Sequence, residues 1–190
     1  MPSLIARHSA VLVVDVQKAL FHTEPPPFEA DAVVARVNHV TSLAHRSGVP
    51  VVIVQHDGDS RDGLKPFSPG WQLHEQLQVP AGAVHIRKTT CDAFFETNLE
   101  AELRTRRVES VILAGYATDF CIDTTLRNAL SRNFHVVVVG DAHTTNESPV
   151  LKALAIRDHL NWAWPNCICK TSVRIINAHD LSFHDESPSE

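Results

Sequence analysis

The stretch Ala10–Val16, AVLVVDV, decides the fold class, because it places six apolar residues around a single acid. A short run that is apolar at successive positions is typical of a strand buried on both faces of a parallel sheet. Asp15 lies inside this run, where a carboxylate is unfavourable unless it is paired or hydrogen-bonded. The turn that follows, VDVQKALF, contains no glycine, which disfavours the phosphate-binding turn of a dinucleotide fold or a P-loop.

Further segments with strand character alternate with stretches of helical periodicity. We expect strands at 10–16, 51–55, 83–87, 110–114, 134–139 and within 167–176. Apolar spacing predicts helices over 33–44, 95–103 and 122–130, and a last helix with Ser148 as its N-cap and Pro149 at its first position. This alternation predicts an α/β fold, a three-layer α/β/α sandwich around a six-stranded, mostly parallel, Rossmann-like sheet.

Length and charge limit the classes of function. The 190 residues fit one domain, which we assign to residues 1–184, with a frayed tail over 185–190. Asp and Glu total 22 against 17 Lys and Arg, which disfavours a surface for nucleic acid or an anionic membrane. No apolar run approaches the ~20 residues of a membrane span, and Met1–Ala10 lacks the apolar segment of a signal peptide. We therefore expect a cytoplasmic protein with four free thiols.

Chemically reactive side chains stand where the predicted strands end. In an open α/β sheet, ligands bind outside the carboxyl ends of the strands, so residues at those ends share one edge. The residues at these ends are Asp15, His56, Asp57, Lys88, Cys121, Asp141 and His143. An acid, a lysine and a thiol at one edge form the arrangement that a nucleophilic site requires. Asp141 and His143 could equally cap the loop that follows the fifth strand.

Cys121 is the strongest candidate nucleophile, because it falls in the first turn of a predicted helix with Thr118 as the N-cap. Unpaired N–H groups and the helix dipole there favour a thiolate, and a nearby lysine is expected to lower the thiol pKa further. The alternatives are an inert buried cysteine, an Asp15 satisfied by loop N–H groups, and a Lys88 whose amine reaches solvent. The three together favour a site, because a buried Asp15 and a buried Lys88 account for each other's charge.

Three stretches carry a resemblance to a known family. GYATDFCIDTTLRNAL (Gly115–Leu130) resembles the nucleophile motif of the isochorismatase-like cysteine hydrolases, which include nicotinamidases and N-carbamoylsarcosine amidase. LVVDVQKALF (Leu12–Phe21) is similar to the family's first-strand motif, and RKTTCDAFFETNLEAEL (Arg87–Leu103) to its lysine motif. The motifs occur in the family's order, and the similarity runs from about Ala10 to Cys167.

This resemblance implies a fold and a set of catalytic residues. The fold is that of the isochorismatase-like hydrolases, and the implied triad is Asp15, Lys88 and Cys121. A cis peptide is implied between Tyr116 and Ala117, with the N–H groups of Ala117 and Cys121 forming an oxyanion hole.

The resemblance also implies an activity, which is hydrolysis of a small-molecule amide through a thioester, without a cofactor. Members that cleave the vinyl ether of isochorismate lack the thiol, so Cys121 favours an amidase over a vinyl ether or ester hydrolase. A non-catalytic binding or redox-sensing module is a further alternative, although it would need no Asp15 or Lys88. Relatives are usually homo-oligomers, and partial exposure of the apolar stretch WAWP (162–165) would fit an interface.

A substrate pocket is predicted around the triad. The expected pocket residues are Gln17, Phe21, Trp71, His74 and Tyr116. They would form an aromatic, largely uncharged wall, several of them on the long loop 56–80. The alternatives are plain packing of this loop and, for Gln17, a role in orienting Asp15 or in satisfying the loop backbone.

No metal is expected. Nicotinamidases carry an Asp-x-His metal pair after the second strand, whereas the corresponding stretch here reads His56–Asp57–Gly58. A metal held by His56, Asp57, Asp59 and His74 is the alternative, although solvated loop residues explain this spacing better. Cys167 and Cys169, spaced C-x-C, have no second ligand pair and are expected in a strand.

Overall fold

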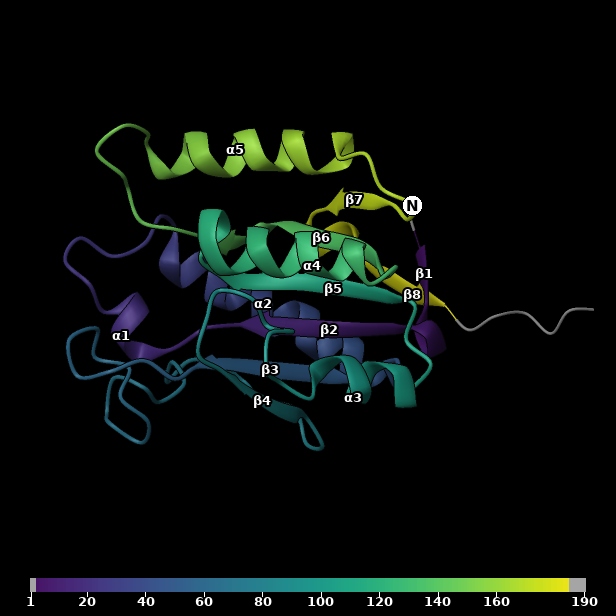
Figure 1. Ribbon diagram of the computed structural model, residues 1–190, viewed down its shortest axis with the longest axis horizontal. Coiled ribbons are helices and arrows are strands. Elements are labelled where there is room, and N and C mark those ends of the chain that lie inside the picture. Colours follow the sequence, from purple (N-terminus) through teal and green to yellow (C-terminus); the bar gives the residue numbers. More distant parts are fainter. Residues whose placement is uncertain (1–2, 185–190) are drawn as a thin grey trace, which may run out of the picture.

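The computed structural model describes residues 3–184, and its centre is a six-stranded parallel sheet in the order β4-β3-β2-β5-β6-β7 (Figure 1). The strands are β2 (Ser9–Val14), β3 (Val51–His56), β4 (Val84–Lys88), β5 (Ser110–Tyr116), β6 (His135–Thr144) and β7 (Val173–Ile176). All six residues of β2 are buried, which explains why the sequence there is apolar at consecutive rather than alternate positions. The predicted parallel sheet is confirmed.

Helices cover both faces of this sheet. α2 (Ala30–Arg46) packs on one face, while α3 (Leu99–Thr105), α4 (Asp123–Ser131) and the end of α5 (Ala153–Ala163) pack toward the other. Figure 1 shows α2 behind the sheet, with α3 and α4 in front of it. Each face of the sheet therefore has its own apolar core, and the predicted three-layer α/β/α sandwich is confirmed.

Several short elements were not predicted. They are β1 (Ser3–Ile5), β8 (Ser182–His184), α1 (Lys18–Phe21), η1 (Ala6–His8), η3 (Trp164–Asn166) and η4 (Ala178–Asp180). The predicted first turn of the helix that carries Cys121 forms a separate element, η2 (Thr118–Ile122), directly before α4. β1 and β8 pair in parallel as a separate two-stranded sheet. Elements of three to five residues carry too little periodicity to be recognised in a sequence.

Gly115 allows the two central strands to approach closely at the end where the reactive residues lie. Its φ is +123°, and a Cβ added there would lie 2.1 Å from the carbonyl oxygen of Val14 on β2. Only glycine fits this contact, so the start of the motif GYATDFC is explained by packing against β2.

The last helix begins later than the sequence predicts. α5 starts at Ala153 with Lys152 at its N-cap, so the expected N-cap role of Ser148 is wrong. Ser148 instead closes a turn, in which its Oγ accepts the N–H of Leu151 at 2.9 Å. Serine forms such local side-chain turns as readily as it caps helices, and the sequence pattern is the same for both.

The predicted helix over 95–103 is also too long. α3 begins at Leu99, and Phe95 precedes it in a turn, with about half of its surface exposed. The turn is held by local bonds, in which Asp92 Oδ1 accepts the N–H of Phe94 and Thr97 Oγ1 donates to the carbonyl oxygen of Ala93.

Cys167 and Cys169 do not lie in a strand, contrary to expectation. They occupy the loop between η3 and β7, and Cys169 is exposed. β7 begins only at Val173, which pairs with Val136 near the start of β6, so Cys167 and Cys169 lie before the residues that join the sheet.

All four cysteines are free thiols, as expected. Within residues 3–184, no helix combines the length and apolar character needed to cross a lipid bilayer. The expected frayed tail over 185–190 lies outside the described residues.

Candidate active site

Three neighbouring strands converge on one buried ion pair. Asp15 follows β2 and Lys88 ends β4, and β3 lies between these two strands in the sheet. Lys88 Nζ lies 2.6 Å from Asp15 Oδ2. The same Nζ lies 3.3 Å from Sγ of Cys121, which η2 supplies just beyond the end of β5. The acid, the lysine and the thiol singled out in the sequence therefore stand together.

Lys88 has more acceptors than it can serve at once. Its side chain is fully buried, with Nζ 2.6 Å from Asp15 Oδ2, 3.0 Å from the Thr90 carbonyl oxygen, 3.3 Å from Cys121 Sγ and 3.4 Å from His56 Nδ1. An ammonium group donates only three hydrogen bonds. Burial lowers the pKa of Lys88, but Asp15 and Cys121 outweigh it and the pKa is raised overall, so Lys88 is charged at neutral pH.

Asp15 is held in an unusual local state. It is 1% exposed, and its backbone adopts the left-handed region with φ of 51°, which is uncommon for residues other than glycine. Oδ2 is paired with Lys88, whereas Oδ1 is buried and has no hydrogen-bond partner among residues 3–184. A buried carboxylate oxygen without a hydrogen-bond donor is energetically costly.

The pKa of the Cys121 thiol is raised, so the expected depressed pKa is wrong. Removal from water is the largest cause, and the Asp15 carboxylate adds to it, while Lys88 acts in the opposite direction. The helix start and the lysine can be read from the sequence, but the depth of the site cannot. Cys121 therefore rests as a neutral thiol, and its attack needs an acceptor for the proton.

The backbone before Cys121 forms a compact turn. The Tyr116–Ala117 peptide is cis, and Ala117, not the expected Thr118, is the N-cap of η2. Cys121 remains within this single turn. In the described part of the chain, the buried Ala117 N–H has no hydrogen-bond acceptor. An unpaired N–H beside a nucleophile can donate a hydrogen bond to a developing oxyanion, as the N–H groups of an oxyanion hole do.

A buried histidine, His143, supports this turn through a hydrogen bond to Thr118. His143 Nδ1 lies 2.8 Å from Thr118 Oγ1, and Nε2 lies 3.0 Å from Asn161 Oδ1. Because the Asn161 oxygen only accepts, Nε2 carries the proton and Nδ1 accepts from the threonine hydroxyl. Burial lowers the pKa of His143 to about 4, so the ring is neutral. Asp141 accepts the N–H of Ala178, so both residues from the end of β6 serve the scaffold.

Phe21, His74 and Tyr116, three of the residues predicted for the pocket, pack against one another through their rings. The Phe21 ring lies 5.5 Å from His74 and 5.9 Å from Tyr116, between ring centroids. The Tyr116 hydroxyl donates to Asn146 Oδ1 at 2.8 Å. Burial, with nearby acidic groups that include Cys121, raises the pKa of Tyr116 to about 12, so the phenol stays protonated next to the triad.

Trp71 and Gln17 hold the loop. The indole N–H of Trp71 donates to Asp57 Oδ1 at 2.8 Å, and the Arg87 guanidinium lies 5.3 Å from the ring centroid. Gln17 is buried; its Oε1 accepts the N–H of His56, and its Nε2 donates to the carbonyl oxygens of His56 and Trp71. Both N–H groups of the Gln17 amide and one lone pair of its oxygen bind the backbone, so this side chain satisfies the loop.

The residues weighed as metal ligands do not gather at one point. Asp57 is engaged by Trp71 and by Arg87, whose guanidinium lies 2.6 Å from Asp57 Oδ2. Asp59 is exposed to solvent and pairs with Arg61, two residues along the loop.

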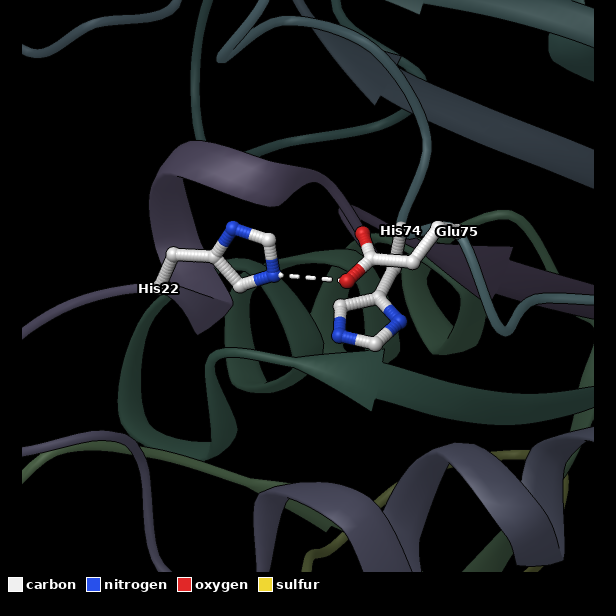
Figure 2. Close-up of side chains that lie close together, drawn as sticks. All are labelled: His22, His74 and Glu75. Atoms are coloured by element: carbon white, nitrogen blue, oxygen red, sulfur yellow. Dashed lines mark hydrogen bonds and ion pairs between the residues drawn. The ribbon is translucent and has the colours of Figure 1, made fainter.

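His74 instead approaches His22 and Glu75, with one ligand atom of each residue within 4.8 Å of the others (Figure 2). His22 Nε2 lies 3.1 Å from Glu75 Oε1, and the N–H of Gln76 donates to His74 Nδ1 at 3.3 Å. Burial lowers the pKa of His74, so the ring is neutral with its proton on Nε2. A metal at either nitrogen of His74 would have to displace that proton or the Gln76 contact, so hydrogen bonds explain the cluster.

Comparison with known proteins shows which family the chain belongs to. The isochorismatase domain matches residues 9–158. The chain belongs to the isochorismatase family. It is 33% identical over 146 residues to a streptothricin hydrolase of Streptomyces noursei, covering 77% of this chain and 58% of that protein. It is 23% identical to a ureidoacrylate amidohydrolase of Variovorax paradoxus, covering 87% and 81%. A crystal structure of an isochorismatase family protein matches with a TM-score of 0.80 at 28% identity, covering 90% of this chain and 98% of the other.

The isochorismatase-family match contains Asp15, Lys88 and Cys121 within its range. The chain spans little more than half the length of the two streptothricin hydrolases it resembles, 58% and 51%. Two features beside the triad were missed from the sequence, namely the contact of His56 with Lys88 and the bracing of Thr118 by His143. Both contacts join segments that lie far apart in the sequence, so no local sequence pattern predicts them.

Proposed function

We propose that this protein is a cysteine-dependent hydrolase of a small-molecule amide that works through a thioester on Cys121. The observation that most directly supports this proposal is the position of Lys88 Nζ, which lies 2.6 Å from Asp15 Oδ2 and 3.3 Å from Cys121 Sγ. Asp15 Oδ1, which has no partner among the described residues, supplies the proton acceptor. A thiol, an acceptor for its proton and a cation that stabilises the anions are the parts that nucleophilic attack requires.

In acylation, the Asp15 carboxylate takes the proton of the Cys121 thiol while the sulfur attacks the amide carbonyl carbon. As the C–S bond forms, the carbonyl electron pair moves onto oxygen, and the N–H groups of Ala117 and Cys121 bind this oxyanion. The C–N bond then breaks as the oxyanion collapses. Asp15 gives its proton to the departing nitrogen, so a neutral amine leaves and the carboxylate is restored.

In deacylation, Asp15 takes a proton from a water molecule whose oxygen attacks the thioester carbon. The second oxyanion collapses with cleavage of the C–S bond, and Asp15 returns the proton to the sulfur. A carboxylic acid and the free thiol result. Lys88 stays an ammonium throughout, because its pKa is raised in the folded protein, and it stabilises whichever partner carries the negative charge.

The surroundings of the triad favour an uncharged or weakly polar amide. Phe21 offers an apolar ring, Tyr116 keeps its phenol protonated, and burial keeps His74 neutral. The amidohydrolase activity carried in the name of the ureidoacrylate relative supports a C–N bond as the target. The proposed reaction needs no metal, because the proton acceptor, the cation and the nucleophile are all side chains of this protein.

A screen of small amides with matched variants tests the proposal. The wild type is expected to release amine, and Cys121→Ser to lose at least about a thousandfold in turnover, as removal of a nucleophile typically does. Cys167→Ser is the matched control, since it removes a thiol from a loop outside the site, and it should keep wild-type turnover.

Three results would replace the proposal. Turnover by Cys121→Ser at the wild-type rate would remove the thioester. Activity of the wild type on vinyl ethers or esters alone would favour the other class of hydrolase. Absence of any turnover, together with reversible oxidation of Cys121, would favour a thiol-based sensing module.

A further inference from the structure

We infer that His56 is a positioning residue, whose Nδ1 accepts the third N–H of Lys88 whenever the sulfur of Cys121 is neutral. The inference rests on the proposed function, and it extends it by giving a task to a residue outside the triad. His56 ends β3, the strand between those that carry Asp15 and Lys88, so it stands at the middle of the site.

Four hydrogen-bond acceptors surround Lys88 Nζ. The two nearest, Asp15 Oδ2 at 2.6 Å and the Thr90 carbonyl oxygen at 3.0 Å, each take one N–H. The third N–H is left with two acceptors at nearly equal distance, Cys121 Sγ at 3.3 Å and His56 Nδ1 at 3.4 Å. Only one of them can be served at a time, so the sulfur and the imidazole compete for a single donor.

The state of the His56 ring fits this competition. The Lys88 ammonium cannot accept a hydrogen bond, so the nitrogen that faces it must carry a lone pair and the proton must lie on Nε2. Burial lowers the pKa of His56, and the Lys88 charge lowers it further. The carboxylates of Asp15 and Asp62 and the Thr90 carbonyl act in the opposite direction without reversing the shift. The ring is therefore neutral and accepting at neutral pH.

His56 is also held in place from both sides. Gln17 binds both its backbone N–H, at 2.8 Å, and its carbonyl oxygen, at 3.1 Å. On the opposite side, His56 pairs in register with Lys88 in the β3–β4 ladder. The buried Gln17 amide thus fixes the backbone of the residue whose ring faces Lys88.

The charge of the Cys121 sulfur decides which of the two acceptors binds the third N–H of Lys88. A thiolate is a strong acceptor, whereas a thiol or a thioester sulfur accepts only weakly. When the sulfur is neutral, before attack and in the thioester, His56 Nδ1 takes the third N–H of Lys88. When Cys121 becomes an anion, that N–H turns to the sulfur. Lys88 keeps three bonds in every state, and its pairing with Asp15 is undisturbed.

Two variants with the same number and branching of side-chain heavy atoms separate this role from plain packing. His56→Leu removes the acceptor, whereas His56→Asn places a carbonyl oxygen near the former position of Nδ1. In His56→Leu the neutral-sulfur state leaves one Lys88 N–H without a good acceptor, so ionisation of Cys121 becomes easier. A fall of one unit in the thiol pKa raises the thiolate fraction about tenfold. Because lower pKa also lowers nucleophilicity, alkylation by iodoacetamide should rise about threefold.

The measurement is the alkylation rate of Cys121 at mildly alkaline pH, read by peptide mass spectrometry with Cys169 as the internal reference. We expect His56→Leu to react about threefold faster than wild type, and His56→Asn to match wild type. Equal rates in both variants would overturn the inference, because access and packing change alike in the two. The readout needs no substrate, so a wild type without amidase activity overturns the proposed function and leaves this comparison intact.

A second measurement uses the wild type and so does not depend on whether a variant folds. Nitrogen-15 NMR of the labelled imidazole distinguishes the two tautomers directly. We expect His56 to be neutral at pH 7 with its proton on Nε2 and an unprotonated Nδ1. A proton on Nδ1 would overturn the inference, because that nitrogen could not then accept from Lys88.

Discussion

Replacing Lys88 with methionine should remove the activity and also destabilise the fold. The side chains of Lys88 and Asp15 are 0% and 1% exposed, and their charged atoms lie 2.6 Å apart. Methionine fills a similar volume but leaves Asp15 buried without its cation, with Oδ1 already unpartnered in the described structure. Breaking a buried pair in this way costs about 3–5 kcal/mol of unfolding free energy. In a chain of 190 residues that lowers the melting temperature by roughly 10 °C.

A double variant shows whether the uncompensated charge is the cause. Lys88→Met/Asp15→Leu removes both charges, and exchange of a buried pair for apolar residues is commonly neutral or stabilising. Urea unfolding followed by tryptophan fluorescence should therefore show a large loss for Lys88→Met and recovery of most of it in the double variant. Both variants should lack amide turnover. The reasoning would be refuted by a Lys88→Met protein as stable as wild type, or by a double variant no more stable than the single one.

Four further outcomes are expected. The unfolding free energy should fall by about 3 kcal/mol between pH 6.5 and pH 4. The reason is that burial lowers the pKa of His143 to about 4, so in this range the unfolded chain binds a proton that the folded protein does not. Urea titration of His143→Gln is the control, and an equal slope in that variant would contradict the prediction. At neutral pH, exposed Cys169 should be alkylated before Cys121, whose thiol pKa is raised, and peptide mapping that finds Cys121 first would count against it. EDTA should leave turnover unchanged, and nicotinamide should be a poor substrate; loss of activity restored by zinc would argue for a metal. Light scattering should give a mass above that of one chain, since Trp162 is 68% exposed, and a monomer at micromolar concentration would exclude this.

The positions of the triad could be predicted because they depend on topology. Once 10–16 reads as a buried parallel strand, Asp15 must stand at the edge of the sheet where the other strands end. Lys88 and Cys121 follow from the same rule, and the structure brings all three together. The strands β2, β3 and β5 were predictable because each contains a consecutive apolar run, the pattern that burial on both faces imposes. β4, VHIRK, alternates between buried and more exposed residues instead.

Properties that depend on depth and on long-range contacts could not be predicted. The pKa of Cys121 was expected to fall, but burial and Asp15 raise it, and neither the depth nor the geometry of Asp15 is visible in a linear motif. From the sequence, the Gln17 side chain could have faced either the substrate or the loop. The structure shows that its amide binds the backbone of His56 and Trp71. Ser148 carries the pattern of a helix N-cap, yet a local turn uses the same hydroxyl.

The most direct test of the account is the capture of a covalent intermediate during turnover. Wild-type protein mixed with an amide that is hydrolysed, then quenched in acid, should gain the mass of the acyl group, and peptide mapping should place it on Cys121. The adduct should disappear with hydroxylamine, as a thioester does, and should be absent from Cys121→Ser. An acyl group on any other residue, or rapid turnover with no adduct under any quench time, would contradict a thioester mechanism centred on Asp15, Lys88 and Cys121.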